Sequence, residues 1–273
     1  MEAWLIVGAG RVGLQLARHM AELDLPFWLL CRSQERLHQA AALLPETRLL
    51  TRMQGPVPAR RVLLAVRDRE VVGAARELAP LLPPRGVVLH CSGALGPEAL
   101  RPLGLRAALG VFHPLLPFPH PVSPRVELAG AVVTVAGDDG AVAAGRELAQ
   151  ALGMVPMVCP HLDWPLYHGA AALAGPMVYA LFRLACSEMA RAGFPRDTVE
   201  KALLPLAQAA LAQAARARGF ESLTGPLVRG DSATVEAHLA ALSGDAQGVY
   251  RALAKAVAYA LSAEPAKEPT PNP

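Results

Sequence analysis

Two histidine-containing clusters have the residue types that proton transfer needs. His90-Cys91-Ser92-Gly93 combines an imidazole, a hydroxyl and a glycine turn, and His113-Pro114 places a second imidazole beside a rigid residue. Histidine exchanges protons near neutral pH, and with a hydroxyl group it can hold a carbonyl, carboxylate or imine. Each histidine alone is as consistent with packing as with chemistry. Together the clusters favour His90, Ser92 and His113 as catalytic candidates and Gly93 as a substrate contact.

Two further candidates lie in the C-terminal half of the chain. His168 follows Tyr167 near the start of a long apolar helix, where a lone histidine more often has a structural role. Arg229 lies in a loop rich in Gly and Pro, residues 224–231, and its guanidinium can pair with a substrate carboxylate. Asp231 is better explained as the N-cap of the following helix. We therefore take His168 as a candidate catalytic residue and Arg229 as a candidate substrate ligand.

A glycine motif carries the clearest functional signal. Residues 8–13, Gly-Ala-Gly-Arg-Val-Gly, match the pattern G-x-G-x-x-G, with an apolar run before it and helical spacing after it. In a dinucleotide site the first glycine permits a tight turn, the second lets the backbone approach a pyrophosphate, and the third lets the helix pack closely. The expected cofactor ligands here are Gly8, Ala9, Gly10, Arg11, Val12, Gly13 and, after a later strand, Val66. The alternative is a glycine turn without a ligand.

The residues after the second expected strand indicate which dinucleotide binds. NAD sites place an acid near this point to bind the ribose hydroxyls, whereas this chain has Arg32, Ser33 and Arg36. Guanidinium and hydroxyl groups suit a phosphate dianion. The sequence therefore predicts NADP, with these three residues at its 2′-phosphate. The alternative is a surface arginine beside a serine that only caps the next helix.

The elements that would position these residues form two blocks. Short apolar runs alternate with helical patterns over the first 160 residues, which predicts the α/β class with a doubly wound parallel Rossmann sheet. The expected strands are 3–7, 27–31, 62–66, 86–90, 107–112, 131–136 and 154–158. Ligands of such sheets bind at the carboxyl ends of the strands, so the glycine motif and both histidine clusters are expected at one edge.

No strand pattern follows residue 160. Helices are expected at 166–192, from 197 or 198 to about 218, at 232–242 and at 245–261. The expected organisation is an NADP-binding Rossmann domain at 1–160, an all-α domain for dimerisation and substrate binding at 161–262, and a disordered tail at 263–273. Ala and Leu recur all round these helices, which favours a homodimer built on the helical domain. The alternative is that the first domain covers this surface.

Composition argues against several other classes of protein. A net charge of +3 with scattered arginines disfavours a nucleic-acid partner. The most apolar stretch, 169–182, is too short for a bilayer and contains Gly175-Pro176, so a buried helix is expected rather than a membrane span. The four cysteines form no Cys-x-x-Cys pair, which is typical of reduced thiols in a cytoplasmic protein. No histidine or cysteine spacing matches a known ligand pattern, so no metal is expected.

Five segments together resemble a family of bacterial proteins that join a Rossmann-like domain to a helical C-terminal domain of unknown function. They are residues 8–13, 90–93, 113–115, 167–171 (Tyr-His-Gly-Ala-Ala) and 224–231 (Thr-Gly-Pro-Leu-Val-Arg-Gly-Asp). Such proteins are often labelled predicted oxidoreductases. The wider superfamily includes pyrroline-5-carboxylate reductase, prephenate dehydrogenase and 6-phosphogluconate dehydrogenase, and His113-Pro114 is similar to a His-Pro motif of prephenate dehydrogenases. This resemblance implies a dimer through the helical domain and a substrate between the domains.

The chain departs from the family pattern in its long apolar helix. The family continues from Tyr-His to a Ser-Asn pair, where this chain has Gly175-Pro176, and the first lysine is Lys201, so lysine-assisted chemistry is not expected. Two hypotheses follow. The first is an NADP-dependent oxidoreductase for a small carbonyl, imine or hydroxy-acid substrate, favoured by the retained histidines. The second, favoured by Pro176, is a non-catalytic NADP-binding sensor or partner-binding protein.

Overall fold

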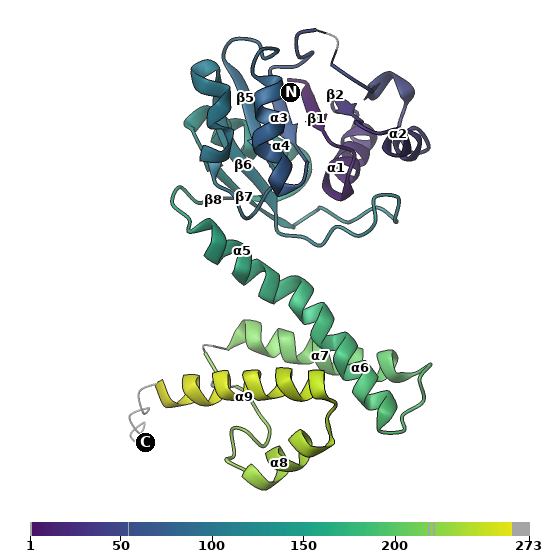
Figure 1. Ribbon diagram of the computed structural model, residues 1–273, viewed down its shortest axis with the longest axis vertical. Coiled ribbons are helices and arrows are strands. Elements are labelled where there is room, and N and C mark those ends of the chain that lie inside the picture. The colour runs from purple at the N-terminus through teal and green to yellow at the C-terminus, as the bar shows by residue number, and fades with distance from the viewer. Residues whose placement is uncertain (1, 54, 218, 221, 264–273) are drawn as a thin grey trace, which may run out of the picture. The chain divides into compact units, whose positions relative to one another are not determined.

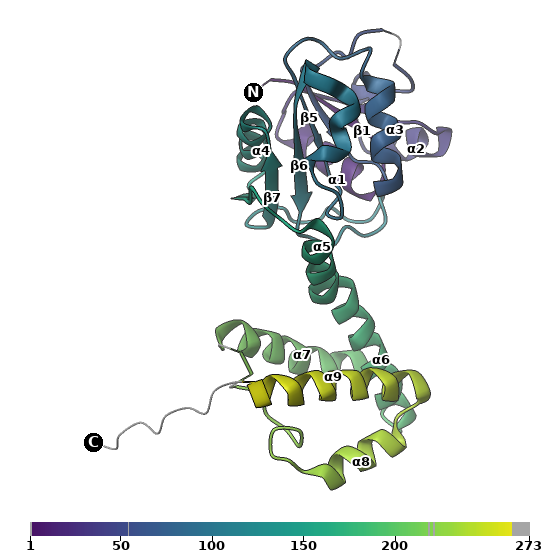
Figure 2. The same cartoon turned by 60° about the vertical axis from the view of Figure 1, so that its left-hand side comes forward.

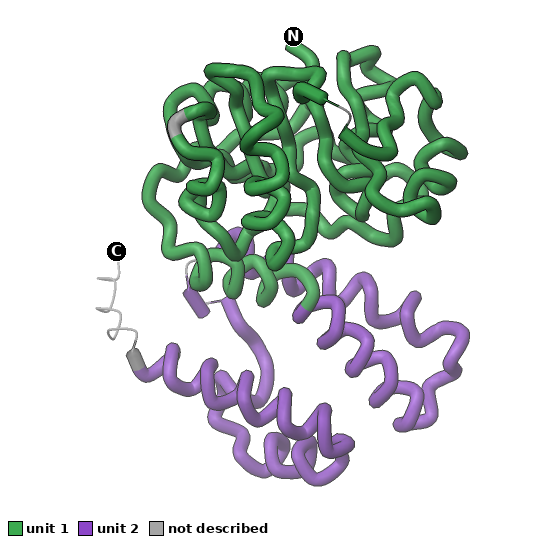
Figure 3. The backbone as a smooth tube through the Cα atoms, turned by 45° about the horizontal axis from the view of Figure 1, so that its top comes forward, with its two compact units in different colours: residues 1–176 green, residues 177–273 purple. Residues whose placement is uncertain are grey.

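The computed structural model describes residues 2–53, 55–217, 219–220 and 222–263. It divides into two compact units, residues 1–176 and 177–273, which Figure 3 shows in green and purple. This division falls later than the expected domain boundary at residue 160, because the first helix after the sheet packs on the sheet through Trp164. The expected disordered tail, 263–273, lies outside the described residues except for Ala263.

Unit 1 is built on an eight-stranded sheet in the order β3-β2-β1-β4-β5-β6-β7-β8 (Figure 1). The strands are β1 (Trp4–Val7), β2 (Phe27–Leu30), β3 (Leu49–Leu50), β4 (Arg61–Leu64), β5 (Gly86–His90), β6 (Ala107–Pro114), β7 (Val132–Gly137) and β8 (Val155–Val158). All neighbouring strands are parallel except β6 and β7, which run antiparallel. The expected α/β Rossmann class followed by a helical region is confirmed, with this one strand pair reversed.

The reversal at β7 has a local cause. Parallel neighbours need a crossover element, but a loop, residues 115–131, joins β6 to β7 without a helix. This loop is fastened to α1 (Arg11–Glu22) by hydrogen bonds that include Arg18 Nη1 to the Ser123 carbonyl, 2.8 Å, and His19 Nε2 to the Val126 carbonyl, 2.7 Å. The two-residue strand β3 was not predicted, because so short a run gives no periodic signal.

Helices cover both faces of the sheet. One core joins α1 and α4 (Asp139–Ala151) to strand residues such as Trp4 and Ile6. The other joins α3 (Asp68–Leu78) and the 3₁₀ segment Pro97–Arg106 to residues such as Leu5 and Val7. Successive strand residues point to opposite faces, so burial of both faces explains why these strands are apolar throughout. The short helices α2 (Gln34–Ala41) and Glu46–Arg48 connect β2 to β3.

A long helix follows β8 and contains one irregular turn. It consists of α5 (Trp164–Ala172), a π-helical turn (Leu173–Met177) and α6 (Val178–Arg191). Pro176 lies in the π turn, since a proline has no N–H to donate to the regular helical ladder. Figure 2 shows α5 beginning beside the carboxyl end of β6. The remaining helices are α7 (Val199–Arg216), α8 (Ser232–Ala241) and α9 (Gly244–Ala263).

Burial is unequal between the units. In the described part of unit 2 only Cys186, Val199 and Ala246 are buried hydrophobic residues. The helix Trp164–Arg191 is long and apolar enough to cross a membrane by length and composition, which for one helix is weak evidence, and only 6% of its most apolar window is buried. The expectation of a buried helix at 169–182 is therefore wrong for the described residues of the single chain.

Candidate functional site

The glycine turn after β1 fits its expected conformation closely. Gly8 has a φ of +107°, and a Cβ there would lie 2.7 Å from the Ala65 carbonyl oxygen. A Cβ on Gly13 would lie 1.9 Å from the Gly8 carbonyl oxygen. Both positions therefore exclude any side chain, one through its backbone conformation and the other through close packing of α1 on β1. Val66 adds a partly buried wall, with Cγ1 3.2 Å from a Cβ built on Gly8.

The N-terminus of α1 is open to an anion. Its N-cap is Gly10, which offers no side-chain acceptor, and its first turn contains no acidic residue. A Cβ on Gly10 would meet only the Ala65 carbonyl oxygen within 4 Å, at 3.9 Å. The first N–H groups of a helix have no intrahelical acceptor and carry partial positive charge. By contrast, α2 and α3 begin at the same edge with Glu35 and Asp68 in their first turns. This cradle fits the pyrophosphate of a dinucleotide.

The three residues expected at a 2′-phosphate all have partners within the chain. Arg32 donates to Glu70 Oε2 at 2.5 Å. Ser33 Oγ caps α2 by accepting from the Arg36 backbone N–H at 3.3 Å, and the Arg36 guanidinium donates to Gln39 Oε1 at 2.7 Å. Arg32 and Ser33 are exposed and Arg36 is partly exposed. Of these contacts, only the one between Arg32 and Glu70 is an ion pair.

A cavity of about 310 Å³ adjoins Arg32. Its apolar walls come from the ends of β1 and β2 and from the inner side of α3, and its polar wall comes from the segment after β3. The lining residues are Val7, Leu30, Arg32, Thr51, Arg52, Met53, Ala74, Glu77, Leu78 and Leu81. An apolar slot beside a cation suits the adenosine end of a dinucleotide.

His90 uses both of its ring nitrogens inside the protein. Nδ1 accepts from the Ser92 backbone N–H at 3.2 Å, and Nε2 donates to the Gly96 carbonyl at 3.0 Å. The side chain is fully buried, and this burial lowers its pKa. Ser92 is also buried, and its Oγ accepts from the Ala94 N–H at 3.2 Å. His90 thus shapes the loop after β5 and has no free nitrogen, which does not fit the predicted role as a proton donor.

His113 has one bonded and one unbonded ring nitrogen. Nδ1 shares a hydrogen bond of 2.7 Å with the Tyr167 hydroxyl, and that hydroxyl shares one of 2.8 Å with Thr134 Oγ1. Thr134 is the cross-strand partner of His113 in the antiparallel pair β6–β7. Nε2 has no hydrogen-bond partner among the described residues and is not one of their buried unpaired atoms, so it reaches solvent. Burial, and then the nearby His168, lower the pKa of His113 to about 4.

Gly93 lies against both His113 and His168. A Cβ on Gly93 would lie 2.6 Å from His113 Nε2 and 2.8 Å from His168 Cδ2. The two imidazoles meet edge to face, with ring centroids 6.0 Å apart. Of the three expected catalytic histidines, the structure therefore brings two together with Gly93. Whether Gly93 contacts a substrate stays a prediction.

The start of α5 positions Tyr167 and His168. Asp163 caps the helix by accepting from the Leu166 N–H at 3.0 Å. The buried Trp164 packs on β6 and β7, and its ring meets the Tyr167 ring edge to face at 5.6 Å. Sequence reasoning missed Thr134, because its place opposite His113 depends on the antiparallel β7 that the pattern did not predict.

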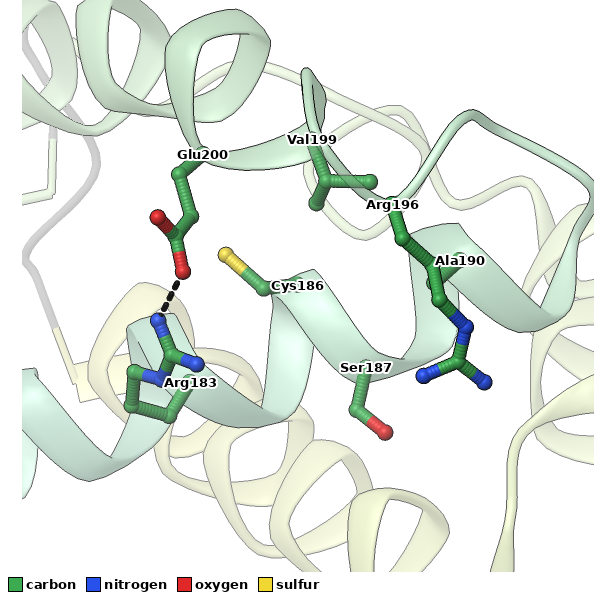
Figure 4. Close-up of a pocket in the computed structure, with 7 residues that line it drawn as sticks. All are labelled: Arg183, Cys186, Ser187, Ala190, Arg196, Val199 and Glu200. Carbon is green, nitrogen blue, oxygen red and sulfur yellow. Dashed lines mark hydrogen bonds and ion pairs between the residues drawn. The ribbon is translucent and has the colours of Figure 1, made fainter.

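Unit 2 holds the remaining expected residue and a separate cavity. Arg229 is exposed, and its role as a substrate ligand stays a prediction, whereas Asp231 caps α8 through the Thr234 N–H at 3.1 Å, as expected. A cavity of about 200 Å³ lies between α6 and α7, where Arg183 pairs with Glu200 (Figure 4). Within the described chain no three His, Cys, Asp or Glu side chains are arranged to hold a metal ion.

Two family models match the chain. A Rossmann-like domain matches residues 3–114, and a domain of unknown function, DUF2520, matches residues 131–257. A comparison with curated proteins finds no match.

Solved structures share the fold over nearly the whole chain. A proposed NADP oxidoreductase, BF3122 from Bacteroides fragilis, is 18% identical, with a TM-score of 0.79 over 94% of this chain and 98% of that one. Protein TM1727 from Thermotoga maritima is 23% identical, with a TM-score of 0.68 over 95% and 98%. A reductive aminase from Aspergillus terreus, in complex with NADPH and ethyl-5-oxohexanoate, is 14% identical, with a TM-score of 0.65 over 95% and 94%. At these identities the likeness concerns the fold alone.

Proposed function

We propose that this chain, which combines a Rossmann-like domain with a DUF2520 domain, is an NADP-dependent oxidoreductase acting on a small carbonyl, imine or hydroxy-acid substrate. One observation carries the proposal. The anion cradle after β1 and the unbonded Nε2 of His113 belong to the same unit and to the carboxyl ends of parallel strands in one sheet. In a doubly wound sheet a dinucleotide lies along that edge. The NADP proteins among the structural neighbours are consistent with this assignment.

The chain would hold the cofactor with backbone and basic groups. The turn 8–13, with Val66 beside it, binds the pyrophosphate, and the apolar cavity accepts the adenosine end. Arg32, Ser33 and Arg36 bind the 2′-phosphate, Arg32 exchanging Glu70 for it. A bound nicotinamide supplies hydride chemistry, and the protein's own part is to place a substrate and manage its proton.

His113 is our first candidate for contact with the reacting group. Its Nε2 is the free nitrogen, its ring is fixed by Tyr167, and its pKa of about 4 keeps it neutral at pH 7. It therefore acts as a hydrogen-bonding and proton-exchanging group at Nε2 rather than as a standing imidazolium. His168 and Ser92 complete the proposed catalytic set, and His90 is reassigned to holding the loop that carries Ser92.

We propose in addition that the protein is a homodimer whose second copy covers the helical unit. Unit 2 exposes large apolar side chains on several helices, including Tyr179, Leu206 and Tyr259, which are 66–76% exposed. An apolar groove of about 310 Å³ lies between α6 and α9. Exposed apolar surface of this extent marks an interaction site. A second copy of the chain exposes the same apolar helices, so its surface is also apolar and can pack against this one.

Turnover measurements test the enzymatic hypothesis. The wild type and His113→Gln are assayed for NADPH oxidation with a panel of small carbonyl, imine and keto-acid compounds, and in the reverse direction with hydroxy acids. His113→Gln should bind NADPH as the wild type does but lose at least 100-fold in turnover, the scale of general acid–base catalysis. His120→Gln, in an exposed loop, is the matched control. NADPH binding without turnover on any compound would favour the non-catalytic sensor instead.

A further inference from the structure

The hydroxyl groups behind His113 form a buried chain with a definite direction. Thr134 is only 2% exposed, and Tyr167 is partly buried between Thr134 and His113. Each hydroxyl has one hydrogen to donate, so the Tyr167 hydrogen goes either to Thr134 Oγ1 or to His113 Nδ1. In the first case His113 carries its own proton on Nδ1. In the second case Nδ1 is an acceptor and a neutral His113 carries its proton on Nε2.

Buried donors decide between these directions. If Tyr167 donates to Thr134, the hydrogen of the buried Thr134 hydroxyl has no acceptor among the described residues. If Thr134 donates to Tyr167 and Tyr167 donates to His113 Nδ1, every buried hydrogen in the chain has an acceptor. An unsatisfied buried donor is costly, whereas an unused lone pair on a hydroxyl oxygen costs less. The second direction is therefore the stable one.

We propose that Thr134 and Tyr167 are positioning residues that hold His113 in the tautomer with its proton on Nε2, so that a neutral imidazole presents an N–H donor to the ligand. Geometry carries this proposal: two hydrogen bonds in series, an antiparallel register that places Thr134 opposite His113, and a free Nε2 beside Gly93. The titratable groups around the ring are His168 on α5, His90 on β5 and Asp68 on α3.

This tautomer limits which substrate groups can bind at Nε2, a consequence that rests on the proposed function. An N–H donor pairs with a carbonyl, carboxylate or hydroxyl oxygen. It cannot pair with a protonated imine, whose nitrogen also carries a hydrogen and a positive charge. Carbonyl compounds, hydroxy acids and neutral imines each offer a lone pair to this N–H and therefore fit, whereas iminium ions do not.

Nitrogen NMR tests the tautomer without substrate or turnover. The uniformly ¹⁵N-labelled full-length protein is studied at pH 7.5, and His113 is assigned by the signals missing in His113→Gln. We expect a protonated Nε2 and an unprotonated, hydrogen-bonded Nδ1 in more than about nine-tenths of the molecules. A protonated Nδ1 on His113 would overturn the proposal, because it is the signature of the opposite direction.

Two tyrosine variants separate positioning from general folding. Tyr167→Phe removes the donor to Nδ1, so the His113 signals should move toward a mixture of tautomers while the rest of the spectrum is kept. Tyr250→Phe is the matched control, since Tyr250 pairs with His238 Nδ1 at 3.0 Å in the same edge-to-face manner. That variant should move His238 and leave His113 unchanged. Unchanged His113 signals in Tyr167→Phe would contradict the proposal.

The substrate consequence has its own readout. Chemical shifts of His113 Nε2–H are followed during titration with a small keto acid and, separately, with a small cyclic iminium salt, each with NADP⁺ present. The keto acid should shift the signal and the iminium salt should not. A shift with the iminium salt would overturn the substrate limit. If the tautomer is as proposed and neither probe shifts the signal, the substrate consequence fails while the positioning role stands, and the turnover panel decides the proposed function separately.

Discussion

Unit 1 and unit 2 differ in how far their apolar side chains are buried within the single chain. Unit 1 contains every buried hydrophobic residue of the described chain except Cys186, Val199 and Ala246, most of them in two cores on the two faces of its sheet and a few in a small cluster around Trp164. Unit 2 has helices of 10 to 20 residues but leaves side chains such as Leu206 and Tyr259 mostly exposed. A domain without a core of its own is stable only when something else covers it.

This difference assigns different tasks to the two parts. The groups that fit a dinucleotide and exchange a proton belong to the part with its own core, where packing holds Gly8, Gly13 and His113 in place. For the helical part, our proposal is that a second copy of the chain supplies the covering surface.

The largest effect is expected from a methyl group at Gly13. Gly13→Ala places a Cβ 1.9 Å from the Gly8 carbonyl oxygen, so α1 must move away from β1. We expect unit 1 to lose about 3 kcal/mol or more of unfolding free energy, at the upper end of overpacking effects. Gly73→Ala is the control, since a Cβ there meets nothing within 4 Å on an exposed helix face. Urea unfolding of both variants checks this, and equal stability would contradict the packing argument.

A charge on the helical unit should weaken self-association. Leu206 on α7 is 66% exposed in the single chain, so Leu206→Glu removes little packing within one copy. Burying a leucine contributes about 1.5–3 kcal/mol, so the dimer dissociation constant should rise on the order of 10- to 100-fold. Leu23→Glu, half exposed at the end of α1, should leave it unchanged. Light scattering across a dilution series measures both, and a monomeric wild type at micromolar concentration would refute the dimer.

The pH dependence of stability should come from unit 1. His113 has a folded pKa of about 4, below its ordinary value of 6.5, because burial disfavours its charged form. The unfolded chain then binds a proton that the folded chain does not, so stability is full above pH 6.5 and falls as pH drops toward 4. From pH 7.5 to 5 the loss from this group is about 2 kcal/mol. Urea midpoints at both pH values should show it, and His113→Gln should reduce it. An unchanged slope in that variant would mean that other groups titrate.

The smallest effect concerns the ion pair at the cofactor edge. Glu70→Gln removes the carboxylate that Arg32 contacts at 2.5 Å, so Arg32 is free for a 2′-phosphate. Exposed ion pairs contribute at most about 1 kcal/mol, so NADPH affinity should rise by roughly two- to fivefold. Isothermal titration calorimetry checks this. Weaker NADPH binding in Glu70→Gln would show that the pair positions Arg32 rather than competing with the phosphate.

Conformations that depend on neighbouring residues could be predicted from the sequence, whereas features that depend on strand pairing could not. The turn at 8–13 has strong local constraints, so its conformation was predictable from glycine spacing. The cap formed by Asp231 was predictable for the same reason. The antiparallel direction of β7 could not be predicted, because it depends on the path of the long loop between β6 and β7. Thr134 was missed for the same reason, since only this pairing places it opposite His113. The internal hydrogen bonds of both His90 ring nitrogens could not be predicted either, because His90 and His113 lie at the ends of expected strands in the same way.

Binding of NADP by unit 1 through Arg32 is tested most directly by paired titrations. Binding of NADPH and NADH is followed by fluorescence for the wild type and for Arg32→Asp. We expect tighter NADPH binding in the wild type. Arg32→Asp should lose on the order of 1.5–3 kcal/mol for NADPH, the value of a charge-assisted contact, with little change for NADH. Equal affinity for the two cofactors in the wild type, or tighter NADH, would contradict the account.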